Sequence, residues 1–252
     1  MSDFDRNVAA RGGFADRAAA VDAGLRAYML RVYNYMAAAV ALTGVVAYAT
    51  FNAAVVTDAS GKITALTPFG QTIFSGPLSI VLLLGTLGLV FFISFRINRL
   101  QYTTAMTLFM LYAALLGVTL SSIFLAYTGA SITRVFFISA ASFGALSLYG
   151  YTTQRDLSPM GSFMIMGLFG IIIASLVNIF LKSSGLDWAI SVIGIGVFAG
   201  LTAWDTQRIK EMYDSMDDDG TMGRKAIMGA LSLYLDFINL FMMLLRLFGD
   251  RR

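Results

Sequence analysis

The chain has 252 residues, of which 58% are hydrophobic and 13% are charged, whereas a soluble domain usually has about 25% charged residues. This composition is typical of a membrane protein, and a net charge of +3 gives no reason to expect a nucleic-acid partner. The sequence contains no Cys and no His, which excludes disulfides, thiolate nucleophiles, His general bases and His-ligated or Cys-ligated metal sites. We therefore expect neither an enzyme nor a bound cofactor.

The first 25 residues are polar and rich in Gly and Ala, which predicts a flexible N-terminal tail. Its acidic residues and the absence of a clear cleavage site argue against a cleaved signal peptide. Residues 26–252 then form one transmembrane domain.

Seven apolar segments follow, and each is close to the roughly 20 residues that a helix needs to cross a bilayer. Polar joints separate them, and strand signals are weak. The pattern predicts an all-α membrane protein with seven transmembrane helices. The predicted spans are residues 27–50, 75–95, 104–126, 131–153, 161–181, 188–208 and 227–248.

The Lys and Arg residues are divided unequally between the two ends of these spans. Twelve lie in the tail and in the joints on the same side, and six lie on the opposite side. The positive-inside rule therefore predicts a cytoplasmic N-terminus, and seven full spans put the C-terminus outside. The basic ending "RLFGDRR" fits poorly outside, so a re-entrant last segment is an alternative.

The sixth span contains the glycine pair Gly196 and Gly200. Small residues at this spacing let two helix backbones approach closely, so the pair predicts a packing surface. The surrounding "GIGVFAG" does not follow a soluble strand, and a dinucleotide-binding loop is a poor interpretation.

Two aspartates lie within the apolar segments. Asp205 is at the inner end of the sixth span, and Asp236 is about ten residues into the seventh. An Asp at a helix centre costs about 2.5–3.5 kcal/mol on insertion scales, so something must offset that cost. Because the two spans are antiparallel neighbours, their carboxylates can meet. The alternative is structural: each Asp holds neighbouring helices together by hydrogen bonds.

The seventh span carries a polar stripe. Ser232, Asp236, Asn239 and Arg246 share one helical face, with Met243 between them. Such a face belongs against protein or water rather than lipid. Arg246, like Arg134 on the same side, is also explained as an anchor whose head group reaches the interface.

Two carboxylates in a low-dielectric site titrate as a coupled pair, which makes them candidates for a proton-sensitive cation site that needs no histidine. Arg96, at the inner end of the second span, is a candidate salt-bridge partner for Asp205, and Arg99 follows closely. Both are equally explained as positive-inside anchors.

Several long motifs resemble the Bax inhibitor family, also called the transmembrane Bax inhibitor motif family. "LSLYLDFINLF", from Leu231 to Phe241, resembles its last-helix signature, and "WDTQRIK" resembles the segment that ends its sixth helix. "GPLSI", "LSSIF" and "FGALSLYGYTTQRDLSPMGSF" are also similar to the family. The resemblance covers nearly the whole chain after about Leu25.

The resemblance implies six helices around a central seventh, and a pH-sensitive calcium leak with an aspartate dyad as sensor. The matching positions are Asp205 and Asp236, which would bind calcium transiently. It also implies an Arg partner for the dyad, matched by Arg96, although the nearby Arg99 leaves the register open. Some members carry an acid inside the second helix, and "SIVLLLGTLGLVFFISF" has none.

Two functions from different classes follow. One is a calcium leak or calcium/proton exchanger in a bacterial inner membrane, with lipid, calcium ions and protons as partners. The other, also implied by the resemblance, is a regulator of membrane protein quality control that acts on a membrane-bound protease. A retinal photoreceptor is excluded because no Lys follows Lys225, and an aspartic protease is a weak interpretation because Asp205 lies near the membrane edge.

Overall fold

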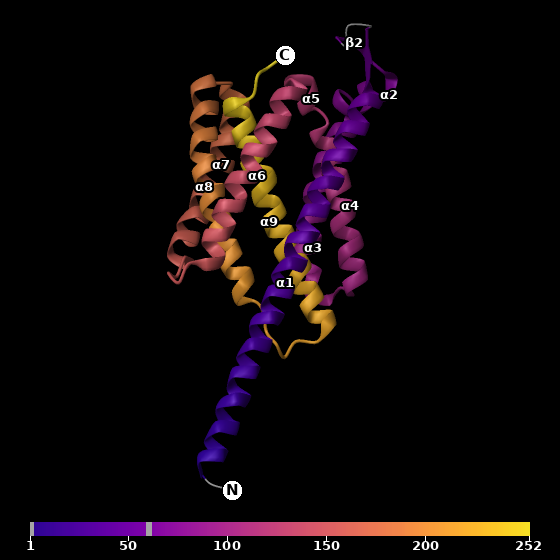
Figure 1. The fold of residues 1–252 in the computed structure, drawn as a ribbon. Coiled ribbons are helices and arrows are strands. Elements are labelled where there is room, and N and C mark those ends of the chain that lie inside the picture. Colours follow the sequence, from indigo (N-terminus) through magenta and orange to yellow (C-terminus); the bar gives the residue numbers. More distant parts are fainter. Residues whose placement is uncertain (1–2, 59–61) are drawn as a thin grey trace.

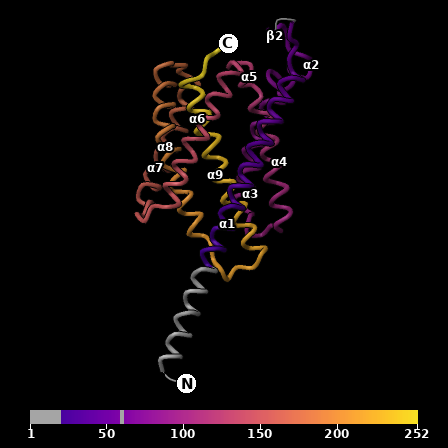
Figure 2. The backbone as a smooth tube through the Cα atoms, viewed as in Figure 1, coloured from indigo at the N-terminus to yellow at the C-terminus, as the bar shows by residue number. Residues whose placement is uncertain are grey.

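The computed structural model describes the backbone of residues 3–58 and 62–252, and the side chains from residue 21 onward within those ranges. The backbone of the predicted tail at residues 1–25 is helical from Asp3, while its side chains up to residue 20 lie outside the described residues; Figure 2 draws the uncertain residues in grey. The elements are α1 (Asp3–Ala54), β1 (Val55–Thr57), β2 (Ile63–Leu66), α2 (Pro68–Phe74), α3 (Pro77–Arg96), η1 (Ile97–Arg99), α4 (Tyr102–Leu120), α5 (Ile123–Ala126), α6 (Gly129–Thr152), α7 (Ser158–Leu181), α8 (Ser184–Glu211) and α9 (Asp219–Phe248).

Within the described residues, 7 helices are long and apolar enough to cross a membrane, which confirms the predicted fold class. Each predicted span falls on one of them. The helices extend past the apolar segments because their polar ends are helical too. The largest difference is at α1, which is helical from Asp3 instead of from residue 27. Helix α9 also begins early, at Asp219, because Asp218 caps it: the Asp218 Oδ2 accepts a hydrogen bond from the Thr221 N–H at 3.1 Å.

Helix α9 lies at the centre of the bundle and packs against α1, α4, α6 and α8 (Figure 1). Its side chains Leu233, Tyr234 and Leu245 are completely buried. By contrast, α3 and α7 have few buried residues and lie at the periphery. This arrangement agrees with the central seventh helix that the resemblance implies.

Close helix approach occurs at glycines other than the predicted pair. A Cβ on Gly150 of α6 would collide with the Ala203 carbonyl oxygen of α8, so only glycine fits there. Gly200 does meet a neighbouring helix, at the Met164 side chain, but Gly196 is exposed, and a Cβ added there would meet nothing within 4 Å. The packing prediction is therefore wrong for Gly196, because the sequence spacing does not say which face of α8 meets protein.

The joint between the first two spans contains structure that the weak strand signals did not predict. Strands β1 and β2 pair antiparallel, with Val55 opposite Leu66 and Val56 opposite Ala65. Helix α2 follows and is capped by Thr67, whose hydroxyl accepts the Gly70 N–H at 3.1 Å. These short elements lie beside the end of α1, at one edge of the bundle (Figure 1).

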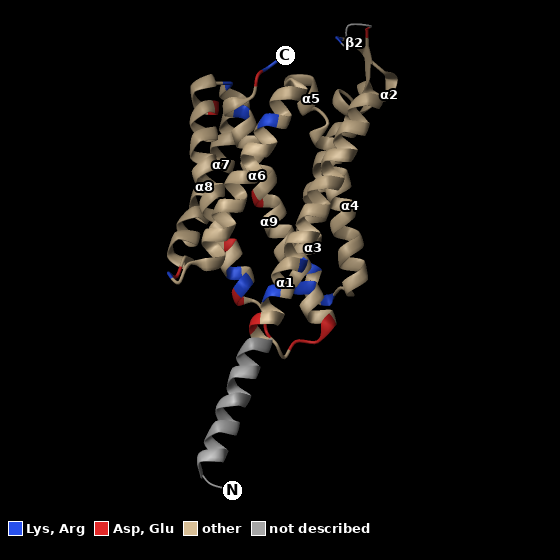
Figure 3. Cartoon of the chain, viewed as in Figure 1, with Lys and Arg blue, Asp and Glu red and all other residues tan. Residues whose placement is uncertain are grey.

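The chain termini lie at opposite ends of the bundle (Figure 1). Helix α9 is unbroken across its full length, so the re-entrant alternative is not observed. The residues after it turn back onto the start of α6, where the Thr128 N–H donates to the Asp250 carbonyl at 3.1 Å and Arg134 pairs with the Asp250 carboxylate at 2.9 Å. Figure 3 shows many of the Lys and Arg residues near the joint between α8 and α9, as the predicted asymmetry requires.

Candidate functional site

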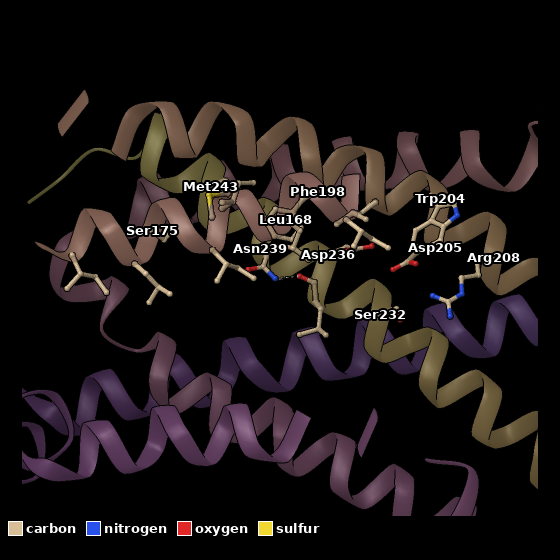
Figure 4. Close-up of a pocket in the computed structure, with 17 residues that line it drawn as sticks. Leu168, Ser175, Phe198, Trp204, Asp205, Arg208, Ser232, Asp236, Asn239 and Met243 are labelled. Atoms are coloured by element: carbon tan, nitrogen blue, oxygen red, sulfur yellow. Dashed lines mark hydrogen bonds between the residues drawn. The ribbon is translucent and has the colours of Figure 1, made fainter. Parts of the chain in front are cut away.

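Asp205 of α8 and Asp236 of α9 face each other across the contact between these two helices. Their side chains interact directly, and Figure 4 shows the two carboxyl groups directed toward one another. Asp236 is 5% exposed, whereas Asp205 is half-buried. The antiparallel packing of α8 and α9, which the short joint between them enforces, is what brings the pair together.

One oxygen of the buried carboxyl has no partner. Among the described residues, Asp236 Oδ2 is buried and accepts no hydrogen bond. Buried polar atoms are nearly always hydrogen-bonded, and an unsatisfied one is costly in an apolar interior. A proton shared by the two carboxyls, or a cation between them, would satisfy this oxygen.

A cavity of about 580 Å³ opens onto the pair between α7, α8 and α9. Its wall on α9 is the predicted polar stripe, represented by Ser232, Asp236, Asn239 and Met243 (Figure 4). The Asn239 side chain donates to the Leu235 carbonyl at 2.8 Å, which leaves its amide oxygen available to the cavity. The stripe thus faces a cavity rather than a packed helix. Arg246, its last member, instead lies 3.7 Å from Asp187 at the other end of the bundle.

The cation beside the aspartate pair is Arg208. It lines the same cavity and interacts electrostatically with the Asp205 carboxyl. Its guanidinium lies over the Trp204 ring, 5.4 Å from the ring centroid, which holds it near the end of the cavity closest to the α8–α9 joint. The sequence contains the signal for this contact, because Arg208 follows Asp205 by three residues and so shares its helical face.

The predicted salt-bridge partners do not reach the pair. Arg96 and Arg99 are both exposed, and neither forms an ion pair with any residue whose side chain the structure describes. The reason is that α3 lies at the periphery and packs against α4 and α2 rather than α8. In this structure their placement fits the alternative interpretation as anchors at the membrane surface.

Neighbouring residues of α8 fix the position of Asp205. Gln207 Oε1 accepts the Leu157 N–H at 2.8 Å, and Gln207 Nε2 donates to the Arg155 carbonyl at 2.8 Å, so this side chain holds the joint between α6 and α7. The Thr206 hydroxyl is 2.8 Å from the Ser147 hydroxyl of α6. Asp205 therefore faces the cavity, Thr206 faces α6, and Gln207 contacts the α6–α7 joint.

Two acidic side chains in the joint between α8 and α9 form contacts with nearby residues of the same segment. Asp217 pairs with Lys225 at 2.5 Å, and Asp218 caps α9. The hydrogen bonds from Thr221 hold the pKa of the Asp218 carboxyl below its usual range. No group of three or more acids within the described residues is arranged to hold a metal ion.

Comparison with known proteins assigns the family. A family model described as "Inhibitor of apoptosis-promoting Bax1" matches residues 25–252. The chain belongs to this Bax inhibitor family. Bax inhibitor relatives include a protein of Rickettsia prowazekii, 52% identical over 92% of both chains, and the inner membrane protein YbhL of Escherichia coli, 48% identical over 91% of this chain and 94% of YbhL. A Caulobacter vibrioides protein is 43% identical over the full length of both chains.

These relatives confirm the family resemblance read from the motifs, and the long apolar helices make this Bax inhibitor family member a multi-pass membrane protein. The roles assigned to Asp205 and Asp236 as pH sensor and transient calcium ligands stay predictions, since the matches give a family and not a site.

Proposed function

We propose that the protein is a pH-sensitive calcium leak, or calcium/proton exchanger, in which the Asp205–Asp236 pair controls cation passage. The observation that carries this proposal is the unpartnered, buried Oδ2 of Asp236, a residue that lies beside a second carboxyl and lines a cavity of about 580 Å³. An acid inside a membrane is functional by default, and this one lies where a cation or a proton would satisfy it.

The chemistry follows from the charge of the pair. When both carboxylates are ionised, two negative charges and the oxygens of Ser232 and Asn239 favour a hard divalent cation, for which oxygen is the preferred ligand. Protonation of one carboxyl removes half of that charge and lets the two groups share a hydrogen bond. The bound cation is then released, and the packing of α8 against α9 tightens.

Arg208 supplies a competing positive charge. Its guanidinium can neutralise Asp205 when no cation is bound, which keeps the empty site from holding two unpaired carboxylates. It replaces Arg96 as the partner in the proposed switch. Since Arg208 is exposed at the inner end of α8, it can swing between the carboxyl and the aqueous phase.

Calcium flux into proteoliposomes, measured across a pH series, tests the proposal. Asp236→Asn keeps the shape of the side chain but removes its titration, so calcium flux should lose most of its pH dependence. Asp205→Asn should do the same, and the double variant should add little because coupled groups act as a unit. Arg208→Gln should move the midpoint of the pH profile, whereas Arg96→Gln should not.

Asp250→Asn is the matched control, because it removes a carboxylate that is exposed and already paired with Arg134. Its flux profile should equal that of the unmodified protein. Unchanged pH profiles for both Asp236→Asn and Asp205→Asn would return these residues to a structural role. No flux at any pH, together with a change in the activity of a co-reconstituted membrane protease, would favour the regulator of protein quality control instead.

We further propose that the protein resides in a bacterial inner membrane, with its N-terminus in the cytoplasm. The excess of Lys and Arg at the end that carries the α8–α9 joint supports this orientation, and the relative YbhL is an inner membrane protein. Because the chain has no natural Cys, a single Cys placed beside Lys62 can be labelled selectively. Labelling of that Cys only from the cytoplasmic side would overturn the orientation.

A further inference from the structure

A second, polar cavity of about 440 Å³ lies at the opposite end of the bundle from the α8–α9 joint. It is formed where α7 ends, α8 begins and α9 reaches its last turn, near the chain's C-terminus (Figure 1). The residues that matter here are Lys182, Ser183, Asp187, Trp188, Arg246 and Arg251. The cavity is lined by charged and hydroxyl groups at the ends of three membrane-spanning helices, and its charge indicates what it can hold.

The cavity lining has three cations and one acid. Asp187 reaches Arg246 at 3.7 Å, a long contact between side chains that are 39% and 38% exposed. Lys182 and Arg251 form no ion pair with any described residue. By comparison, the nearby Arg134 and Asp250 are joined at 2.9 Å. The cavity therefore carries an excess of positive charge that no protein carboxylate neutralises.

The backbone places one of these cations at the cavity with some strain. Lys182 adopts a left-handed conformation, with φ 48° and ψ 35°, where glycine is the usual residue at the end of a helix. Asn178 holds the turn: its carbonyl accepts the Lys182 N–H at 2.8 Å and its side chain accepts the Ser183 N–H at 3.0 Å. A lysine in a glycine-type position suggests a use for the side chain.

The first turn of α8 adds to the positive potential. Ser183 caps this 28-residue helix and accepts the Leu186 N–H at 3.3 Å, so the remaining N–H groups of the first turn point toward the cavity mouth with the positive end of the helix dipole. This contribution is secondary to the side-chain charges. It favours the same kind of ligand, an anion.

Apolar side chains beside the cavity indicate where the anion comes from. Trp188 is 61% exposed and lines the cavity, and at the end of α7 Phe180 is 87% and Leu181 63% exposed. Tryptophan is enriched at the level of lipid headgroups, and exposed Phe and Leu require lipid tails around them. A ligand that suits this surface has an anionic head and an apolar body.

We propose that this cavity binds the phosphate headgroup of an anionic phospholipid. The guanidinium of Arg246 or Arg251 would take two phosphate oxygens through paired N–H donors, and Lys182 would add a point charge. The acyl chains would lie along Phe180 and Leu181. Asp187 opposes binding, since it competes for Arg246. Free inorganic phosphate has the same head but cannot use the apolar surface.

Quenching of tryptophan fluorescence by brominated lipid provides the test. The chain has 2 Trp residues, so a Trp204→Phe background leaves Trp188, in the cavity wall, as the only fluorophore. Vesicles of phosphatidylcholine would contain a rising fraction of brominated phosphatidylglycerol in one series and brominated phosphatidylcholine in the other. We expect quenching by phosphatidylglycerol to saturate at a low mole fraction, and quenching by phosphatidylcholine to follow its bulk fraction.

Variants that are expected to weaken and to strengthen the lipid preference distinguish headgroup binding from a purely structural role of these residues. Lys182→Gln combined with Arg251→Gln should weaken the preference for phosphatidylglycerol about 25-fold, at roughly a factor of five for each basic residue lost. Asp187→Asn should strengthen it several-fold, which a merely structural Asp187 would not do. Arg134→Gln removes a cation at the same end that lies outside the cavity lining, and it should change the preference little.

Two further outcomes would contradict the proposal: competition by inorganic phosphate, and equal quenching by the two lipids. If millimolar inorganic phosphate removes the saturable quenching at constant ionic strength, the cavity takes the phosphate group from solution and the lipid is not its specific ligand. If both lipids quench Trp188 equally, and the Lys182→Gln and Arg251→Gln double variant behaves as the parent, no anionic headgroup binds and the proposal is wrong. Neither outcome depends on calcium flux.

Discussion

Helices α9 and α7 are both apolar and long enough to span a membrane, yet they occupy opposite environments. In α9, 72% of the most apolar window is buried inside the protein, whereas in α7 the share is 6%. The polar groups follow the same division: α9 contains Ser232, Asp236 and Asn239 within its span, and α7 presents mainly Ile, Leu, Met and Phe to its surroundings.

In a soluble protein the most apolar elements lie inside, whereas in this membrane protein the more uniformly apolar helix lies outside. Lipid tails solvate apolar side chains as well as the protein interior does, so the more uniformly apolar helix can stay outside. A helix with a carboxylate has to be inside, where other helices and a cavity shield it from the hydrocarbon. The position of α9 at the centre and the position of the candidate site on α9 therefore have one physical cause.

The same substitution in both helices should give the largest contrast. Ile227 of α9 is completely buried, and Ile173 of α7 is 61% exposed. Ile227→Ala should cost about 2–3 kcal/mol, the low end of the range for buried Ile, because in a membrane the loss is mainly packing and the cavity left behind. Ile173→Ala should change stability by about 0.5 kcal/mol or less.

Unfolding of the two alanine variants in mixed detergent micelles, followed by circular dichroism, measures this difference. Ile173→Val serves as a conservative control on the lipid-facing side. Equal losses of stability at both positions would mean that α7 is buried in an assembly of several copies, and the contrast between the two helices would disappear.

A pair of glycines in α8 sharpens the comparison within one helix. A Cβ on Gly194 would lie 2.9 Å from Met243 of α9, whereas a Cβ on Gly196, two residues away, would meet nothing within 4 Å. Gly194→Ala should cost about 1 kcal/mol because the flexible Met243 has to move. Gly196→Ala should stabilise the helix by up to about 1 kcal/mol, since alanine loses less backbone entropy.

Thermal unfolding in detergent measures both the expected loss of stability in Gly194→Ala and the expected gain in Gly196→Ala. The prediction fails if Gly196→Ala is the more damaging of the two changes. That outcome would place a partner helix on the lipid-facing side of α8 and restore the glycine pair predicted from the sequence.

Much of this fold is predictable from hydrophobic length alone. Seven spans and their order follow from the need to satisfy the backbone inside a bilayer, and the central place of α9 is consistent with its polar stripe. The meeting of Asp205 with Asp236 is predictable too, since the sixth and seventh spans are sequence neighbours that run antiparallel.

The cation beside the pair was harder to predict. Arg96, Arg99 and Arg208 all lie near helix ends on the same side of the bundle, and only the spacing of three residues from Asp205 distinguishes Arg208 in the sequence. The choice depends on which helix is peripheral: α3 is, and α8 is not. The hairpin β1–β2 was missed because its strands have 3 and 4 residues, too short for an alternating pattern. Both the position of the cation and the short hairpin depend on tertiary packing, which is determined by the whole sequence and not by a local pattern.

The smallest expected effect concerns how α9 and α7 begin. Asp218 caps α9, and the Asp156 carboxylate accepts the Ser158 N–H at 2.8 Å at the start of α7. These hydrogen bonds hold the pKa of each carboxyl below its usual range. A carboxyl with a lowered pKa stabilises the folded state above its unfolded value, about pH 4, and that stability is lost as the pH falls through the folded value.

Asp218→Asn keeps an oxygen that can accept the Thr221 N–H but has no charge to lose. At pH 7 the variant should melt slightly below the unmodified protein, by about 2 °C or less, and this difference should shrink as the pH falls below about 4. Asp156→Asn should follow the same course with a smaller difference, because α7 contributes fewer buried contacts to the bundle. Melting temperatures in detergent between pH 3 and pH 7 measure this, and subtracting each variant from the unmodified protein cancels the titration of the Asp205–Asp236 pair. A difference for Asp218→Asn that stays constant from pH 7 to pH 3 would show that its charge does not stabilise α9, and that the cap acts through its hydrogen bond alone.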